Sequence, residues 1–247
     1  MVKLNTFWCI MDIDWSDFMS HTHKDHDHTC LVTVPIFNHL ELDELTKITE
    51  LIKSKSFDKG ELIFSYGEKS DTLYIVRSGQ IKMYYLSENA KEHILRMLFP
   101  GDFIGELSIF LDEKNNAYAE AITPVEVCMI KKEDISKLME IYPKIGLKII
   151  GELTQKLKKS EKQASWIATE QVEKRILLYM LELYDSNEPL KPIELPMSKK
   201  DLASFLGTTP ETLSRKLAYL EDLGMIHQLS NKQIKIVKMD LLLEFLN

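Results

Sequence analysis

Three polar side chains near the carboxy-terminal end of the chain are spaced for recognition chemistry. Glu211, Ser214 and Arg215 stand at positions i, i+3 and i+4, so a helix would present them on one face. In the major groove of DNA, Arg can fork onto guanine, Glu can accept from the amino group of cytosine, and Ser can do either. Because any exposed helix carries such residues, the meaning of this recognition face depends on the elements around it.

The stretch 196–226 predicts two short amphipathic helices joined by a tight turn. Ser198 is the predicted N-cap of the first helix and Gly207 ends it, while Thr209 and Pro210 begin the second. Leu213, Leu217 and Leu220 recur at helical spacing in the second helix, so we expect them to form its buried face. This arrangement predicts a helix-turn-helix with the recognition face pointing outward.

A polar hairpin is predicted directly after these helices, over residues 227–237. Ile234 and Ile236 alternate with Lys235, which is typical of a short strand. The two helices and this hairpin together predict a winged helix-turn-helix. Side chains near the recognition face would contact phosphate and so position the recognition helix. The candidates for these backbone contacts are Lys199, Lys200, Thr209, Lys216 and Lys232.

Charge is unevenly distributed along the chain. The 247 residues carry a formal net charge of −7, yet residues 1–141 hold 15 basic and 24 acidic side chains and residues 142–247 hold 16 and 14. The two parts are thus at −9 and +2, so a phosphate-binding surface is electrostatically possible only in the second. No transmembrane run or secretory signal is visible, which predicts a cytoplasmic protein without a membrane partner.

Residues 1–34 have no sustained period and contain a tract rich in histidine. His and Cys at close spacing suit zinc or copper, although the pattern of a structural zinc finger is absent. A polar leader without metal is the alternative, and either Met1 or Met19 can be the true start. The candidate metal ligands are His21, His23, His26, His28 and Cys30.

Between Phe57 and Ile130 the chain breaks into short β-type runs separated by glycines, which predicts a sandwich or jelly roll. Three motifs carry a more specific pattern, namely Gly60-x-x-Ile63-Phe64-x-x-Gly67, Leu73-Tyr74-x-Val76-x-x-Gly79 and Pro100-Gly101-Asp102-Phe103-x-Gly105-Glu106. On these motifs and the winged helix-turn-helix, the chain resembles the Crp/Fnr transcription regulators. The resemblance implies a sequence-specific DNA-binding protein that is not an enzyme, and no catalytic motif competes with it.

The resemblance implies an α+β fold with three successive parts after the leader. These are a cyclic-nucleotide-binding-type β-roll over 35–141, a dimerisation helix over 142–166 and the winged helix-turn-helix over 167–247. Helical periodicity predicts a lead-in helix within 35–52 and another helix over 168–184.

The long helix carries an apolar stripe that the roll or a second copy must cover, and the resemblance implies that both do. This stripe runs through Ile145, Ile149, Leu153 and Leu157. A homodimer would place two recognition faces about one turn of duplex apart and so bind a palindromic site.

The resemblance breaks at the effector pocket of the roll. In relatives that bind cyclic nucleotides, an Arg and a small hydroxyl residue clamp the phosphate; here Gly105 and Glu106 are kept, but Asn116 and Ala117 stand at those two positions. An anion would meet no positive charge from these residues, so a cyclic nucleotide response is disfavoured. We interpret Gly105-Glu106 as a turn with an exposed or locally bonded acid.

Three cysteines, Cys9, Cys30 and Cys128, are too few for the four-cysteine iron-sulfur cluster of oxygen-sensing Fnr proteins, and no cofactor is firmly implied. Two of them match positions in the Fnr-like proteins of Gram-positive lactic acid bacteria, which implies a redox disulfide between Cys30 and Cys128. A buried Cys128 without redox role, a metal response through the leader and an effector-independent regulator are the alternatives.

The resemblance also implies which bases are bound. Glu211-x-x-Ser214-Arg215 reproduces the E-x-x-S-R pattern of the Fnr group, so the expected half-site is TTGA-like. Arg215 would fork onto the guanine, Glu211 would bind the paired cytosine and Ser214 the neighbouring T·A pair. The expected partners are double-stranded DNA, a second copy and, for an activator, RNA polymerase.

Overall fold

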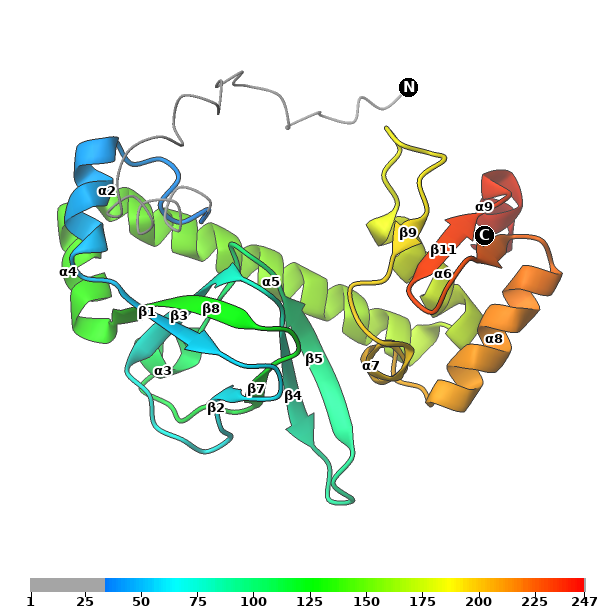
Figure 1. Ribbon diagram of the computed structural model, residues 1–247, viewed down its shortest axis with the longest axis horizontal. Helices are drawn as coiled ribbons and strands as arrows, with labels where there is room; N and C mark the ends of the chain where they lie inside the picture. The colour runs from blue at the N-terminus through cyan, green and yellow to red at the C-terminus, as the bar shows by residue number, and fades with distance from the viewer. Residues whose placement is uncertain (1–33, 247) are drawn as a thin grey trace.

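The computed structural model describes residues 34–246, which form a β-roll, a long helix and a small winged domain (Figure 1). The roll consists of two four-stranded antiparallel sheets. The first has the order β1 (Lys53–Phe57), β8 (Val125–Lys131), β3 (Thr72–Ser78) and β6 (Phe103–Ile104). The second has the order β2 (Leu62–Phe64), β7 (Tyr118–Ala121), β4 (Ile81–Leu86) and β5 (Glu92–Leu98). The predicted α+β fold is confirmed.

The two sheets enclose an apolar interior. Along β7, Ala119 and Ala121 are fully buried, whereas Tyr118 and Glu120 on the other face are partly exposed. This alternation is that of a strand with one face in a core, and the small alanines leave room for larger side chains opposite. Ile81 and Val127 contribute such side chains to the same cluster. The interior is thus filled by protein side chains from both sheets.

Helices cover the outer face of the first sheet. The entry segment 34–37, α2 (Leu42–Thr49), α4 (Lys132–Ile141) and the start of α5 (Pro143–Thr169) share one apolar cluster with β3 and β8. Ile145 and Ile149 of α5 are at most 3% exposed in this cluster. The roll therefore covers this part of the predicted stripe. In Figure 1, α5 passes behind the roll and ends beside the winged domain.

The winged domain follows a break after α5. The predicted helix over 168–184 is wrong in its start, because α5 continues to Thr169 and Glu170 and Gln171 have extended backbone before the next helix. The remaining elements are α6 (Val172–Leu183), β9 (Ile193–Glu194), α7 (Lys199–Phe205), α8 (Pro210–Asp222), β10 (Ile226–Gln228), β11 (Gln233–Ile236) and α9 (Met239–Leu246). Strands β10, β11 and β9 form a small antiparallel sheet, so the predicted winged helix-turn-helix is confirmed.

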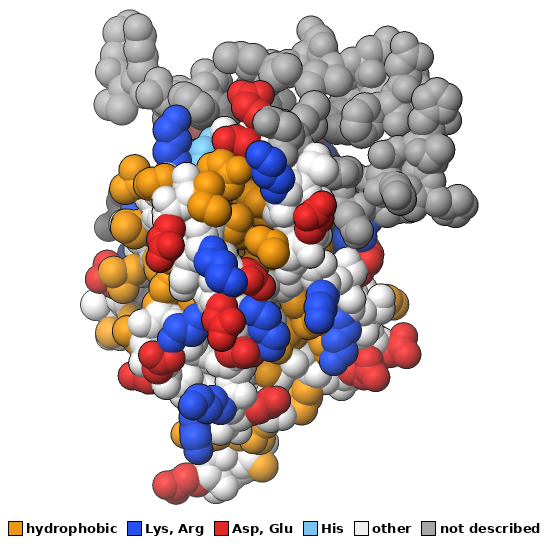
Figure 2. Space-filling model, turned by 90° about the vertical axis from the view of Figure 1, so that its left-hand side faces the viewer, with side chains coloured by type: hydrophobic (Ala, Val, Ile, Leu, Met, Phe, Trp, Pro, Cys, Tyr) orange, Lys and Arg blue, Asp and Glu red, His pale blue; other side chains and the backbone are white. Residues whose placement is uncertain are grey.

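The end of the molecule that carries α2 and α4 shows no segregation of charge. Figure 2 shows Lys and Arg side chains interspersed with Asp and Glu around hydrophobic patches on this face. Such a mixed surface does not attract a polyanion, in line with the acidic balance of the roll. Within the described part of the chain, no helix has the length and apolarity needed to cross a bilayer.

Candidate nucleic-acid interface

The recognition helix α8 is oriented by its cap and by its buried leucines. Thr209 is the N-cap, and its hydroxyl accepts from the Thr212 backbone N–H at 3.3 Å, as the sequence predicted. Leu213, Leu217 and Leu220 have 0% exposure. They belong to the core of the winged domain together with residues of α6, α7 and the wing. Burial of this stripe fixes which face of α8 points to solvent.

The recognition face is that exposed side of α8. Glu211, Ser214 and Arg215 are all exposed, at the spacing that the sequence predicted. Hydrogen bonds from its own backbone N–H and from the Thr209 side chain hold the pKa of the Glu211 carboxyl below its usual value. Glu211 is therefore ionised at neutral pH and accepts hydrogen bonds only, as a contact to the cytosine amino group requires.

The first helix of the motif, α7, is held by neighbouring elements. Gln163 of α5 donates to the Phe205 carbonyl at 2.8 Å, and Arg175 of α6 donates to the Leu206 carbonyl at 2.7 Å. These bonds satisfy carbonyls that a helix end leaves free. Gly207 closes the helix with φ +66°, and a Cβ there would lie 3.3 Å from Ile167. The turn between α7 and α8 is thus fixed on both sides.

The side chains predicted to contact phosphate differ in their exposure and in whether they already have a partner within the protein. Lys200 and Lys232 are exposed, and the Lys199 ammonium donates to the Gln228 side chain at 2.8 Å. Lys216 is only 30% exposed and forms an ion pair with Glu173 of α6. This pair could not be predicted from the sequence, since its partners are 43 residues apart. The phosphate contacts themselves remain predictions, and for Lys216 such a contact would compete with Glu173.

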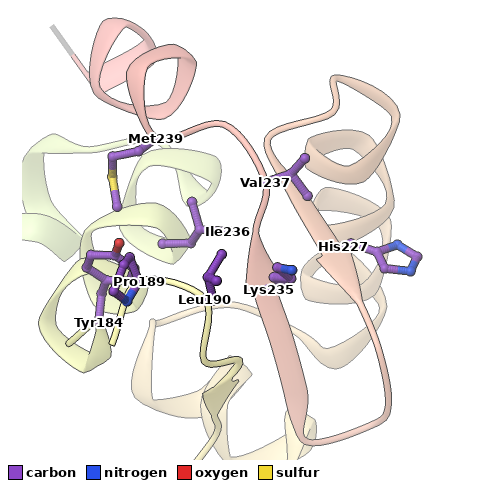
Figure 3. Close-up of a pocket in the computed structure, with 8 residues that line it drawn as sticks. All are labelled: Tyr184, Pro189, Leu190, His227, Lys235, Ile236, Val237 and Met239. Carbon is purple, nitrogen blue, oxygen red and sulfur yellow. The ribbon is translucent and has the colours of Figure 1, made fainter. Parts of the chain in front are cut away.

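A groove of about 470 Å³ opens beside the wing (Figure 3). Its lining is mainly apolar and consists of Tyr184, Pro189, Leu190, His227, Lys235, Ile236, Val237 and Met239. None of the residues that the sequence singled out for DNA contact or for an effector lines it. The groove therefore adds nothing to the recognition face.

The retained motif in the roll is a buried ion-pair site, which corrects the interpretation of Gly105-Glu106. Gly105 has φ +98°, and a Cβ there would lie 2.4 Å from the Thr72 carbonyl oxygen, so only glycine fits. The Glu106 side chain is 13% exposed and pairs with Arg96 at 2.8 Å and with Lys156 at 3.4 Å. We call Arg96, Glu106 and Lys156 the charge cluster. Its acid is mostly buried, and its ion-pair partners come from β5 and α5 and not from the turn itself.

The charge cluster contains cations that the sequence did not indicate at positions 116 and 117. Asn116 is exposed and Ala117 is fully buried, so neither offers an anion clamp. Arg96 from β5 and Lys156 from α5 nevertheless bring two cations to Glu106, and these come from elements that the motif does not include. Burial would raise the pKa of Glu106, but the charges of Arg96 and Lys156 outweigh burial and lower it. Both cations are thus engaged by the protein's own carboxylate.

Burial of the charged Lys156 ammonium is energetically unfavourable. Burial lowers its pKa to about 8 although Glu106 opposes the change. Its ammonium also donates to the Phe103 carbonyl at 2.7 Å and lies 3.4 Å from the centre of the Phe103 ring. Two atoms of the cluster, Arg96 Nε and Glu106 Oε2, are buried without a hydrogen-bond partner. The hydrogen-bonding capacity of the charge cluster is therefore only partly used.

Cys128 lies on β8, where it is 1% exposed. It belongs to the same apolar cluster as Val34, Ile36 and Phe37 of the entry segment. Cys128 is disulfide-bonded, and its partner is not among the described residues. The other predicted redox and metal residues, Cys30 and His21, His23, His26 and His28, lie outside the described residues. Within 34–246 no group of three His, Cys, Asp or Glu side chains could hold a metal ion.

Comparisons with known proteins agree with this architecture. A model of the cyclic nucleotide-binding domain matches residues 54–142, and a model of the Crp-like helix-turn-helix domain matches residues 174–245. The "Probable transcriptional regulator flp" of Lacticaseibacillus casei is 32% identical over 210 residues, which cover 85% of this chain and 94% of that protein. The "Fumarate and nitrate reduction regulatory protein" of Vibrio cholerae is 32% identical over 184 residues, which cover 73% and 72% of the two chains.

Solved structures show the same fold. FixK2 from Bradyrhizobium japonicum superposes with a TM-score of 0.68 at 24% identity, over 78% of this chain and 96% of that one. A roll, a long helix and a winged helix-turn-helix with an exposed polar recognition face define a DNA-binding transcription regulator, not an enzyme. With two family models matched and a relative of 32% identity aligned over most of both chains, the protein belongs to the Crp/Fnr family.

Proposed function

We propose that the protein is a homodimeric regulator that binds a palindromic, TTGA-like site through Glu211, Ser214 and Arg215. The observation that carries this proposal is the recognition face itself. Three side chains able to bind bases are exposed on α8, while the opposite stripe of the helix is buried in the core of the winged domain. The sequence of the half-site follows from the E-x-x-S-R pattern and from the pairing of Arg with guanine and Glu with cytosine.

A second apolar stripe on α5 supports the dimer. Leu147, Ile150 and Leu157 are 69%, 61% and 58% exposed, and Thr154 completes the spacing of three and four residues. This α5 stripe is distinct from Ile145 and Ile149, which the roll buries. Large apolar side chains at such spacing are those of a helix that packs against a partner helix. Two copies joined along α5 would carry two winged domains on one assembly, as a palindromic site requires.

Selection of sites from random duplexes tests the proposed specificity. The selected sites should share inverted half-sites with a TGA core. Arg215→Ala should cost about 1–3 kcal/mol of binding free energy for the selected site and blur discrimination at the guanine. Lys232→Ala, the matched control, should weaken selected and scrambled duplexes alike. A selected site without TGA, or an equal loss on both duplexes for Arg215→Ala, contradicts the assignment of this face.

We further propose that the signal is redox state, through a reversible disulfide between Cys30 and Cys128. Support comes from the packing of Val34, Ile36 and Phe37, which follow Cys30 closely in sequence, against the strand that carries Cys128. The disulfide-bonded state of Cys128 is in line with this proposal. Formation of a disulfide requires the two Cα atoms to approach within about 7 Å. Cys30→Ser should abolish any effect of oxidant on DNA affinity, and an unchanged oxidant response in this variant would exclude the pair.

Metal binding by the leader is the second candidate signal. The close spacing of His21, His23, His26, His28 and Cys30 supports it, since imidazole and thiolate are ligands for zinc and copper. Metal analysis of protein purified without an affinity tag distinguishes the two candidates. Bound metal that is lost on replacing His26 and His28 favours the metal response, and metal-free protein with a thiol-dependent DNA affinity favours the redox response.

A further inference from the structure

His39 is a histidine whose ring has no hydrogen-bond partner. It follows the entry segment by two residues, and within the described part of the chain both of its ring nitrogens are buried and bond no other group. In a neutral imidazole one nitrogen is a donor and the other an acceptor, so two bonding positions of His39 are unused. Buried polar groups nearly always have a partner, which is a protein group, a water molecule or an ion. His39 is therefore a candidate ligand.

The backbone that carries His39 is held in place by the roll and its helices. Val34, Ile36 and Phe37 have 0% exposure in the apolar cluster that they share with α2 and α5. The Val34 carbonyl accepts from the Phe37 N–H at 2.9 Å and from the Asn38 N–H at 3.1 Å, which closes a turn. The imidazole is thus presented from an ordered turn, so little further ordering is needed when it binds a ligand.

The surroundings of His39 favour its neutral form. Burial lowers its pKa, and the charges of Lys148 and Lys144 on α5 lower it further, while Glu44 of α2 opposes them. The neutral imidazole is the form that binds a metal ion. Both lysines are exposed, so solvent screens their repulsion of a cation, and the Glu44 carboxylate partly offsets it.

A sequence tract with further imidazoles ends just before this turn. His26 and His28 are two residues apart, and side chains at that spacing lie on one side of an extended backbone. Only five residues separate His28 from Val34, so both imidazoles are held at high effective concentration near His39. Within 34–246 no group of three His, Cys, Asp or Glu side chains could hold a metal ion. A metal site at His39 therefore needs ligands from this tract.

We propose that His39 completes a zinc site with His26 and His28 and so ties the leader to the helices that cover the roll. Three imidazoles with one water molecule are a ligand set that suits zinc. Cys30 is not part of this set, because it can be the disulfide partner of Cys128, and a disulfide has no thiolate to offer. This inference rests on the second candidate signal of the proposed function, metal binding by the leader, and adds the ligand that joins the leader to the roll.

Zinc titration of the full-length, untagged protein tests this site, after bound metal has been removed with a chelator. The variant is His39→Gln and the matched control is His93→Gln, since His93 lies on β5 and stacks on Tyr85 with 5.1 Å between the ring centres. Glutamine is neutral and polar like the imidazole, so both variants should fold. Wild type and His93→Gln should bind one zinc ion with equal affinity, and His39→Gln should bind it at least about 10-fold more weakly.

Nuclear magnetic resonance of protein with isotope-labelled histidine gives a second readout, on wild type itself. One ring nitrogen of His39 should shift when one equivalent of zinc is added, and this resonance is assigned by its absence from His39→Gln. The inference is overturned if the His39 resonances stay unchanged while zinc binds, or if His39→Gln binds zinc as tightly as His93→Gln. Either result would mean that His39 has a water molecule as its partner and not zinc.

The inference and the metal response can fail separately. If wild type binds neither zinc nor copper, both are wrong. If His39→Gln binds zinc like wild type and the double variant His26→Gln, His28→Gln does not, the leader binds metal alone and only the site at His39 is refuted. Binding of copper without zinc likewise refutes the zinc site and leaves the metal response standing. Zinc bound equally well by the double variant refutes both.

Discussion

Replacing Lys156 with methionine should stabilise the protein at neutral pH and remove one source of its pH dependence. The Lys156 side chain is 18% exposed, and burial lowers its pKa from 10.5 to about 8. Between these two values the unfolded chain holds a proton that the folded chain has released. Stability from this group therefore rises with pH through this window, and the full cost of the buried charge applies below pH 8.

The magnitude follows from the two pKa values. The difference between 10.5 and about 8 corresponds to about 3 kcal/mol, of which about 2 kcal/mol should be recovered between pH 8 and pH 10. Methionine can keep the contact with the Phe103 ring through its sulfur, and Arg96 still pairs with Glu106 at 2.8 Å. We expect Lys156→Met to be about 1–3 kcal/mol more stable than wild type at pH 7, as for buried ion pairs replaced by apolar groups.

Urea denaturation from pH 7 to pH 10 measures this effect. The control is Lys159→Met, since Lys159 is an exposed lysine on the same helix and should follow wild type at every pH. Tyr84, whose pKa burial raises to about 12, is present in all three proteins and cancels in the differences. A gap between wild type and Lys156→Met that stays constant over this range, or a Lys156→Met protein that is less stable at pH 7, refutes the reasoning.

Three further substitutions, the last with a matched control, probe other elements. Ile150→Lys places a charge in the exposed α5 stripe and should convert a dimer to monomers in sedimentation. An unchanged mass would refute the α5 stripe as the dimer interface. Thr209→Ala removes the cap of α8 and should cost about 1 kcal/mol in thermal unfolding; no loss would mean that solvent replaces the cap. Gly79→Ala puts a Cβ 2.2 Å from the Pro124 carbonyl oxygen at φ +83° and should sharply lower stability. Gly151→Ala, with open space around it, should not.

The elements of the winged domain were predictable because their determinants are local. Ser198 caps α7 by accepting from the Asp201 N–H three residues away, and Gly207 ends it with a positive φ. Leu213 and Leu217 repeat at helical spacing within one element. Such short-range rules act through sequence neighbours, so the order of helix, turn and recognition helix is encoded in the stretch that forms it.

Two strands of the roll could not be predicted for the opposite reason. β1 reads Lys-Ser-Lys-Ser-Phe with four of its five residues exposed, and it exists because β8, about 70 residues later, pairs with it. β7 is short and alanine-rich, and its strand geometry comes from lying between β2 and β4. An edge strand with polar faces and a strand of small residues carry little periodic signal.

The partners in the candidate sites also come from distant sequence. Glu106 was recognised from its motif, but Arg96 is 10 residues away and Lys156 is 50 residues away. Likewise the spacing within α8 predicted which side chains are exposed, yet nothing local indicates that Lys216 pairs with Glu173. Side-chain pairing between elements depends on tertiary packing, which the motif does not contain.

The contact between helix α7 and strand β5 bears on solubility, because the Ser204 hydroxyl accepts from the Ile94 N–H at 3.0 Å and donates to the Glu92 carbonyl at 2.8 Å. A bare strand edge invites pairing with the edge of another molecule, and proteins therefore cover or charge their edges. Here a helix of the winged domain covers the edge at Glu92 and Ile94. A protein whose winged domain swings free, or a truncated roll without that domain, would present this edge to other copies. We therefore expect the winged domain to protect this edge of the roll from pairing with other molecules, in addition to its contact with DNA.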